Sequence, residues 1–435
     1  MSSSKHTVRM LILGMGSLEN KGNLAILEGT VETVKRFVPD SQFVVMSHGP
    51  RNELDRFPVR AIPSIIEAPL GSKTKKLFRT AFVLAKGLVT VFILVLWKIS
   101  QSFPHLGQDT FLNSFGLKQY VDSDLVIVRG SDAAFSDFYN LDSLLFTFLM
   151  ILPCLILRKK TAVLGHSVGP FKSRIAKILT RFILKRVDLI TVREPLSMKI
   201  LKDIGVRNRN VFETSDLAFT LPLVSDKTTN GVLQAERIPM NRPIVGVSAS
   251  RLISKWFPAR NQELRYQEYV QFMAKIVKHV NETLDAIVVF VPHVVGPEKY
   301  DDDRIVARDI CQIISDKDMI RIINGEYSAS ELRGIIRHCD IFVGTRMHAV
   351  ISAISACVPS LAISYLHKTE GIMNSINQGH WVCPIKGIDY DETVARIDDL
   401  YAKRSFISAE LRKQTCEIEK KALHNGKLVQ NLLQV

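Results

Sequence analysis

The sequence contains no motif that would mark a metalloprotein, a disulfide-stabilised protein or a dinucleotide-binding protein. Its six cysteines have no C-x-x-C spacing and lie mainly within apolar segments, so we expect buried thiols in a reducing compartment. Its eleven histidines form no H-x-x-x-H or H-E-x-x-H pair, so no metal site is predicted, and residues 301–303 are interpreted as an exposed charged loop. The loop at 14–23 contains G-x-G without G-x-G-x-x-G, which gives no support for a dinucleotide cofactor.

Long polar or repetitive tracts are also missing. The chain is 46% hydrophobic and 23% charged, which is typical of a globular protein, and 435 residues predict two or three domains. The first nine residues are polar and lead directly into a strand-like run, so we expect no signal peptide and a cytoplasmic location.

Acidic residues are outnumbered by basic ones. The 57 Lys and Arg residues against 43 Asp and Glu give a net charge of +14, which favours anionic partners. Basic residues lie beside apolar runs, at Lys73, Lys75, Lys76 and Arg79 and again at 158–160. This placement suits an anionic membrane surface better than a nucleic-acid groove, so we expect the former and no nucleic acid. A basic surface that is simply solvated is the alternative.

Two apolar stretches stand out. Residues 81–97 contain one charge, Lys86, and are close to the lower limit of about 17 residues for spanning a bilayer. A core helix, a helix lying in the membrane interface and a spanning helix all remain open for this stretch. Residues 144–157 are shorter and contain Pro153, so we expect a buried core helix there.

Short apolar runs alternate with helical patterns along most of the chain, and this alternation predicts an α/β protein with parallel strands. The pattern lapses at 224–243, which are polar and rich in helix breakers, and then resumes. We therefore predict two Rossmann-like domains, 1–224 and 244–390, that face a cleft, followed by a helical segment, 391–435.

An anion site is predicted where the apolar strand 340–344 ends. Thr345 is expected to cap the next helix, which places Arg346 and His348 in its first turn at the carboxyl edge of the sheet. Free backbone N–H groups, the positive end of the helix dipole, a guanidinium and an imidazole would then converge. A solvated arginine and a structural histidine are the alternative.

Three other segments are predicted to contribute to a ligand site. Arg193 follows a strand at 188–192 and precedes a helix, so it would provide the second side of an anion clamp, or else serve as an ion-pair residue. His293 follows the strand 286–291 and is expected to face the same cleft, although an exposed loop histidine is equally compatible. Asn20 and Gly22 would let the backbone of the first loop approach a ligand.

Six segments together resemble the polysaccharide pyruvyl transferase family, and the similarity extends over about residues 8–373. They are NKGN (20–23), GHSVGPF (165–171), TVREPLS (191–197), TSDLAF (214–219), VPH (291–293) and CDIFVGTRMHAVISAISACVPSLAISYLHK (339–368). The resemblance implies two domains of the glycosyltransferase B architecture. It also implies transfer of the enolpyruvyl part of phosphoenolpyruvate to sugar hydroxyls as a ketal.

The same resemblance places Arg193, Arg346 and His348 at donor-binding and catalytic positions, with Lys368 following in the last motif. One departure occurs in RGSDAAFSD (129–137), where Ser131 and Asp132 stand in place of glycines that are common in relatives. We expect this departure to affect the choice of acceptor.

The candidate residues suit this chemistry on their own terms. Phosphoenolpyruvate carries a carboxylate and a phosphate, which two guanidinium groups can hold, and His348 can supply the proton, so no metal or cofactor is required. We expect a cell-surface glycan or its lipid-linked precursor as acceptor, at the inner face of the cell membrane. The alternatives are a nucleotide-sugar-dependent glycosyltransferase of the same architecture and a non-catalytic, membrane-associated glycan-binding protein.

Overall fold

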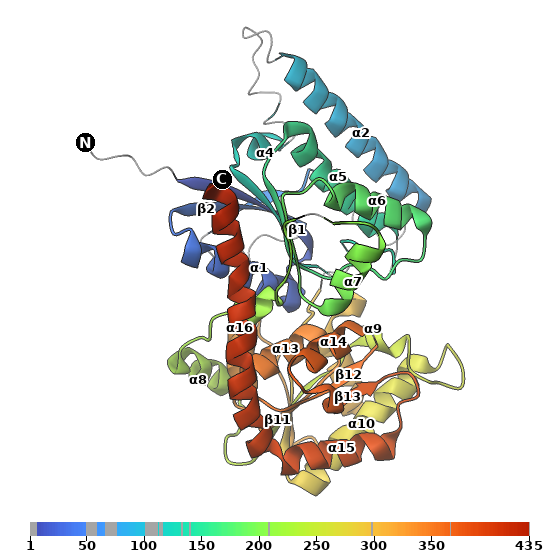
Figure 1. The fold of residues 1–435 in the computed structure, drawn as a ribbon. Helices are drawn as coiled ribbons and strands as arrows, with labels where there is room; N and C mark the ends of the chain where they lie inside the picture. The colour runs from blue at the N-terminus through green and yellow to red at the C-terminus, as the bar shows by residue number, and fades with distance from the viewer. Residues whose placement is uncertain are drawn as a thin grey trace, which may run out of the picture. The chain divides into compact units, whose positions relative to one another are not determined.

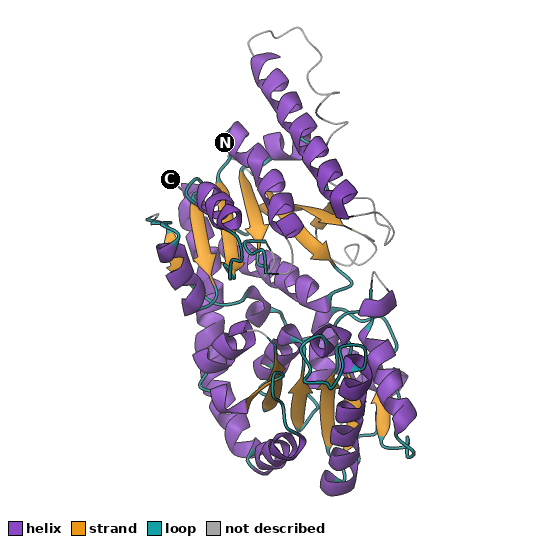
Figure 2. Cartoon of the chain, turned by 90° about the vertical axis from the view of Figure 1, so that its right-hand side faces the viewer, coloured by secondary structure: helices purple, strands orange, loops and turns teal. Residues whose placement is uncertain are grey.

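The computed structural model describes residues 7–48, 59–65, 76–100, 112, 116–131, 134–138, 141–207, 209–296, 299–365 and 367–434. The chain divides into two compact units, each built around one sheet with helices beside it (Figures 1 and 2). The first unit contains residues 1–18, 30–217 and 421–435, and the second contains residues 19–29 and 218–420.

The sheet of the first unit has seven parallel strands in the order β3-β2-β1-β4-β5-β6-β7. The inner strands β4 and β6 are buried along their whole length, which explains why they appear in the sequence as continuous apolar runs. The strands are β1 (Val8–Ser17), β2 (Ser41–His48), β3 (Val59–Pro63), β4 (Leu125–Arg129), β5 (Thr161–His166), β6 (Leu189–Val192) and β7 (Val211–Glu213).

Helices pack on this sheet and close its core. The predicted core helix at 144–157 is confirmed within α5, whose Leu144, Met150 and Ile151 are buried. The helices are α1 (Lys21–Phe37), α2 (Lys76–Ser100), α4 (Lys118–Asp122), α5 (Leu141–Leu157), α6 (Arg174–Leu184) and α7 (Pro195–Asp203). Residues 21–29 of α1 are grouped with the second unit.

The sheet of the second unit has six parallel strands in the order β10-β9-β8-β11-β12-β13. These are β8 (Ile244–Ser248), β9 (Ile287–Phe290), β10 (Ile320–Ile322), β11 (Ile341–Gly344), β12 (Ser360–Ser364) and β13 (Val382–Pro384). Both sheets confirm the predicted α/β class with two parallel, Rossmann-like units.

The helices of the second unit include α12, which begins with a capping box in which Ser328 and Glu331 exchange both capping hydrogen bonds. The set comprises α8 (Asp226–Ala235), α9 (Arg251–Ser254), α10 (Arg265–Leu284), α11 (Asp303–Ile313), α12 (Ala329–Ile336), α13 (Met347–Ser355), α14 (His367–Ser375), α15 (Tyr390–Ala402) and α16 (Arg404–Gln434). Residues of α16 from Lys421 onward are grouped with the first unit.

The division of the chain differs in detail from a simple series of domains. The units separate at Leu217 and Ala218, and the polar segment 224–243 contains the regular helix α8 of the second unit. The backbone N–H of Lys21 donates to the carbonyl of His293 at 2.8 Å, which is one reason why residues 19–29 belong with the second unit.

The apolar stretch 81–97 lies within α2. Its Ile93 and Leu94 join the core of the first unit, whereas Leu88 and Phe92 on the other side of the helix are exposed. No helix in the described parts of the chain, α2 included, has the length and apolar character needed to cross a membrane.

Candidate functional site

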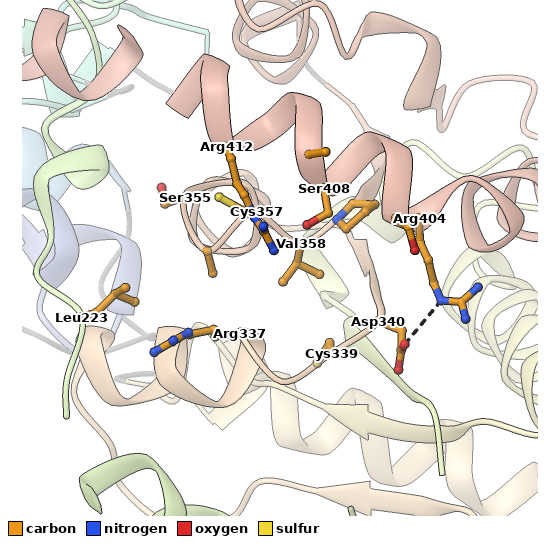
Figure 3. A pocket seen from close by; sticks show the side chains of 14 residues that line it. Leu223, Arg337, Cys339, Asp340, Ser355, Cys357, Val358, Arg404, Ser408 and Arg412 are labelled. Carbon is orange, nitrogen blue, oxygen red and sulfur yellow. Dashed lines mark ion pairs between the residues drawn. The ribbon is translucent and has the colours of Figure 1, made fainter. Parts of the chain in front are cut away.

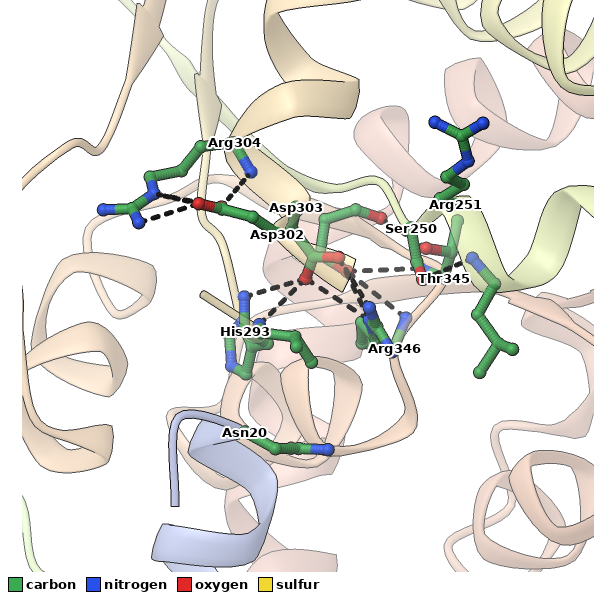
Figure 4. A network of polar contacts seen from close by, with 12 residues as sticks. Asn20, Ser250, Arg251, His293, Asp302, Asp303, Arg304, Thr345 and Arg346 are labelled. Atoms are coloured by element: carbon green, nitrogen blue, oxygen red, sulfur yellow. Dashed lines mark hydrogen bonds and ion pairs between the residues drawn. The ribbon is translucent and has the colours of Figure 1, made fainter. Parts of the chain in front are cut away.

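Three sequence-predicted residues of the second unit, Asn20, His293 and Arg346, lie near one another at the carboxyl edge of its sheet (Figure 4). Ser250 follows β8, His293 follows β9, Arg346 follows β11 and Tyr365 follows β12. The two neighbours β8 and β11 connect onward in opposite directions, to β9 on one side and to β12 on the other. Such a switch point leaves a crevice in which open α/β sheets bind their ligands.

The end of β11 presents the amino terminus of α13. Arg346 is the N-cap residue, it forms no side-chain capping hydrogen bond, and His348 lies in the first turn. The prediction that Thr345 caps this helix is wrong, because its hydroxyl donates to the carbonyl of Ser248 at 2.9 Å and its backbone belongs to the strand end. Thr345 instead fixes the end of β11 against β8.

Arg346 is held by a carboxylate that the sequence did not indicate. Its Nη2 donates to Oδ1 of Asp303 at 2.7 Å, and its Nε lies 3.3 Å from both carboxylate oxygens. The expectation of an exposed loop at 301–303 is therefore wrong for Asp303, whose side chain is buried in the first turn of α11. Burial opposes the charge of Arg346, but the ion pair with Asp303 raises the pKa of the guanidinium. The side chain of Arg346 keeps 16% of its surface exposed, so a ligand can still reach it.

His293 lies on the other side of Asp303. Its backbone N–H and that of Val294 donate to Oδ2 of Asp303 at 3.1 and 3.0 Å, and its Nδ1 lies 3.3 Å from the carbonyl oxygen of Val291. The ring is buried, so the alternative of an exposed loop histidine is wrong. Burial, together with the nearby positive charges of Arg346 and Lys21, lowers the pKa of His293 to about 3. His293 is therefore neutral near pH 7.

The loop before α1 packs against these residues. Asn20 pairs with Val294 in an antiparallel bridge, and its Oδ1 accepts the backbone N–H of Gly22 at 3.0 Å. A Cβ atom at Gly22 would lie 2.5 Å from Nδ1 of His348, so only glycine lets the loop approach this ring. The neighbouring Lys21 is 3% exposed, and its position in NKGN was the only signal that could have identified it.

The carboxyl end of β12 contributes Tyr365 and Lys368. Tyr365 stacks on Trp256 with ring centroids 4.6 Å apart, and its phenol is close enough to Arg346 to affect the pKa of the guanidinium. Lys368 is in the first turn of α14 and is 3% exposed. Trp256 is an aromatic wall of this edge that no sequence motif indicated.

Arg193 belongs to the first unit and lies in a buried polar network. Its Nε donates to the hydroxyl of Ser167 at 2.8 Å, its Nη1 pairs with Asp216, and Ser167 in turn donates to Glu194 at 3.0 Å. The side chain of Arg193 has no exposed surface. Arg193 is therefore an ion-pair residue, as one of the two interpretations of the sequence proposed. Its partner, Asp216, lies in the motif TSDLAF, which is the sequence signal that could have identified it.

Arg129 and Ser131 of the segment 129–137 lie at the carboxyl edge of the first sheet, where β4 ends. Arg129 at the end of β4 is completely buried, and burial lowers its pKa to about 10 although the charge of Asp216 acts against this shift. The carbonyl of Ser131 accepts the backbone N–H of Ser167 at 3.4 Å. Asp132, the second residue of the predicted departure, lies outside the described residues.

A cavity of about 640 Å³ is found at the opposite edge of the second sheet (Figure 3). Asp340 and Pro359 in its lining precede β11 and β12, and Arg404 at the start of α16 turns toward Asp340 with an ion-pair distance of 3.4 Å. None of the sequence-predicted site residues lines this cavity. The carboxyl edge around Arg346 thus remains the candidate site.

The arrangement around Arg346 is suited to binding an anion. The start of α13 adds its partial positive charge to the guanidinium, and His348 lies one turn away at most, where it can exchange a proton with a bound ligand. Within the described ranges, no group of three or more His, Cys, Asp or Glu side chains is placed to hold a metal ion.

Comparison with known proteins gives a consistent result. Residues 20–367 match the family model described as polysaccharide pyruvyl transferase. The amylovoran biosynthesis protein AmsJ of Erwinia amylovora is 23% identical over 430 residues, covering 98% of this chain and 99% of that protein.

Solved structures share the fold at low identity. UDP-GlcNAc 2-epimerase from Neisseria meningitidis, solved with UDP-GlcNAc, has a TM-score of 0.62 at 11% identity, covering 98% of this chain and 100% of that one. A glycosyltransferase from Rickettsia africae has a TM-score of 0.56 at 13% identity, covering 99% of both chains. These neighbours establish an architecture that glycosyltransferases and epimerases share.

Proposed function

Because the chain belongs to the polysaccharide pyruvyl transferase family, we propose that it transfers the enolpyruvyl group of phosphoenolpyruvate to sugar hydroxyls and forms a pyruvate ketal. The acceptor in this proposal is a cell-surface glycan or its lipid-linked precursor, a role that the name of the amylovoran biosynthesis relative supports. The observation that carries the proposal is that Arg346 and His348 both lie at the start of α13, which follows β11 at the carboxyl edge of the second sheet.

The donor would bind at this edge through its charged groups. Arg346 is oriented by Asp303 and is partly exposed, so its guanidinium can add a bidentate contact to a carboxylate or phosphate. Backbone N–H groups at the start of α13 would hold the remaining anionic oxygens. Lys368 and the loop of Asn20 and Gly22 border the edge and complete the proposed donor site.

His348 is the proposed general acid. A proton is added to the methylene carbon of phosphoenolpyruvate while one sugar hydroxyl attacks the adjacent carbon. A second hydroxyl of the same sugar then displaces inorganic phosphate to close the ketal ring. His293 is unsuited to the first step as an imidazolium, because its pKa of about 3 leaves it neutral.

Arg193 is also proposed to contact the donor, on the condition that it first releases Asp216. Its guanidinium is paired with Asp216, so it would have to exchange that carboxylate for the donor in order to bind it. If it does not, its role is to position the strand ends of the first unit, and the positive charge for the donor comes from the second unit. We propose that the enzyme works at the inner face of the cell membrane.

Donor binding tests the assignment. We expect phosphoenolpyruvate to raise the melting temperature of the wild type and Arg346→Ala to lose most of this shift. A charge-assisted contact contributes about 1.5–3 kcal/mol, or about 10- to 100-fold in Kd. Arg304→Ala is the matched control, because Arg304 is next in sequence to Asp303, the partner of Arg346, but itself pairs with Asp302. Equal shifts in the wild type and Arg346→Ala would remove Arg346 from the donor site, and stabilisation by nucleotide sugars alone would favour a glycosyltransferase.

A further inference from the structure

The solvent side of α2 is apolar from Leu84 to Leu96. Its exposed large side chains are Leu84, Leu88, Val89, Phe92, Val95 and Leu96, with Leu88 72% and Phe92 63% exposed. The opposite side packs into the core through Ile93 and Leu94. The helix is thus apolar on both sides, and the outer side is much more hydrophobic than a surface that faces only water.

A second helix, α6, presents apolar and basic residues side by side. Ile175, Ile178 and Phe182 are exposed and recur at intervals of three and four residues, so they form one stripe. Arg174, Lys177, Arg181 and Lys185 are exposed at the same intervals and line one edge of that stripe. The helix contains no acidic residue.

The helix α5 joins these two surfaces. It packs against α2 on one side and α6 on the other, so the three helices lie side by side in Figure 1. Phe148 of α5 contacts Phe182 of α6 with ring centroids 6.0 Å apart. We name the outer side of α2, α5 and α6 the three-helix face. Its only acidic residue among the described ones of these helices is Asp142.

We propose that the three-helix face docks on the surface of an anionic lipid bilayer. The exposed side chains of α2 would enter the boundary between head groups and acyl chains, and the cations of α6 would contact anionic head groups. A second copy of this chain is a poorer occupant, because the described residues of its own three-helix face would offer the cations of α6 a single acidic side chain, Asp142. This inference does not depend on the transfer chemistry proposed above.

The three-helix face includes the predicted apolar stretch 81–97, but its cations differ from those that the sequence indicated. Lys73 and Lys75 lie outside the described residues, and Lys159 and Lys160 donate to backbone carbonyls of Ser123 and Leu432 within the first unit. The cations assigned to lipid are those of α6, which the sequence did not indicate.

Co-sedimentation with vesicles tests the proposal. The full chain is mixed with phosphatidylcholine vesicles with and without phosphatidylglycerol, and the bound fraction is measured. We expect binding only with phosphatidylglycerol. The triple variant Arg174→Gln, Lys177→Gln, Lys185→Gln should bind about 100-fold more weakly, because each basic residue near an anionic surface contributes about fivefold.

Matched variants separate charge, apolar contact and folding. Neutralising Arg412, Lys413 and Lys421, which are exposed on α16, changes the net charge equally and should leave binding near the wild-type value. Leu88→Ser with Phe92→Ser should weaken binding by more than about tenfold without loss of the helical circular-dichroism signal, because both side chains are exposed.

Three results would overturn the inference. The wild type could fail to sediment with phosphatidylglycerol vesicles, or the α6 variant could bind no more weakly than the α16 control. The wild type could also prove dimeric by light scattering while Leu88→Ser with Phe92→Ser is monomeric, which would assign the face to a second copy. Failure of pyruvyl transfer with intact vesicle binding would contradict only the proposed function.

Discussion

Individual residues at the carboxyl edge of the second sheet differ in what they can do, even where two of them are histidines. His348 lies at the start of α13 beside the loop of Gly22, whereas His293 is buried behind Asp303. The local environment, rather than the residue type, therefore distinguishes His348, the candidate acid, from His293, which is neutral near pH 7.

The first prediction at this scale concerns His348. We expect His348→Ala to keep the thermal shift produced by phosphoenolpyruvate and to lose turnover by about 100- to 10,000-fold, as for a positioned general acid. His293→Ala should have the smaller effect on kcat. Rates of phosphate release decide the matter, and a His348→Ala enzyme that turns over normally would remove the assignment.

The second concerns Glu28 in α1. Burial raises its pKa to about 7, although the hydroxyl of Ser330 and the charges of Arg333 and Lys21 act against this shift. The folded state therefore binds more protons than the unfolded state between about pH 4.5 and 7, and stability falls as pH rises through this window.

Glu28→Gln should remove this dependence and stabilise the protein at pH 8 by on the order of 2–3 kcal/mol relative to the wild type. Glu32→Gln on the exposed side of the same helix is the control and should show no such gain. Denaturant unfolding at pH 5 and pH 8 measures the difference. A wild-type stability that is constant or rises between these values would contradict the account.

Short elements decide how the site is assembled, and they are also the least predictable from sequence. The strands with continuous apolar runs, such as β6 and β11, were predicted because burial on both faces leaves a clear signal. The three-residue strands β7 and β13 lie at sheet edges and carry no such run. The role of Asp303 as the partner of Arg346 was not predicted. A run of three aspartates indicates an exposed loop unless it is known that a buried arginine pairs with one of them.

The prediction at this scale concerns the loop before α1. Gly22→Ala should displace His348 or the loop, because the added Cβ would lie 2.5 Å from the ring, so activity should fall at least about tenfold while the fold is retained. Gly231→Ala in α8 is the matched control, since a Cβ there meets nothing within 4 Å. Equal activity of both variants would show that the approach of Gly22 to His348 has no functional role.

The whole molecule contains two α/β units, each built on one parallel sheet. Each unit is formed by segments that are not continuous in the sequence. The sequence predicted both units because hydrophobic periodicity is local and repeats in each. The sequence could not predict that residues 19–29 belong to the second unit and residues 421–435 to the first. That assignment depends on contacts between segments that are distant in the sequence, such as Thr191 with Asn425. Family membership, which the motifs indicated, holds for the chain as a whole.

The account as a whole depends on the reaction, and one measurement tests it directly. The protein is incubated with phosphoenolpyruvate labelled in its pyruvyl carbons and with a panel of lipid-linked sugars, and both inorganic phosphate and label in the sugar are measured. We predict that phosphate is released in equal amount to the label incorporated, and that Arg346→Ala and His348→Ala reduce both. Label that never enters any sugar of the panel would contradict pyruvyl transfer, and release of a nucleotide when a nucleotide sugar replaces phosphoenolpyruvate would favour a glycosyltransferase.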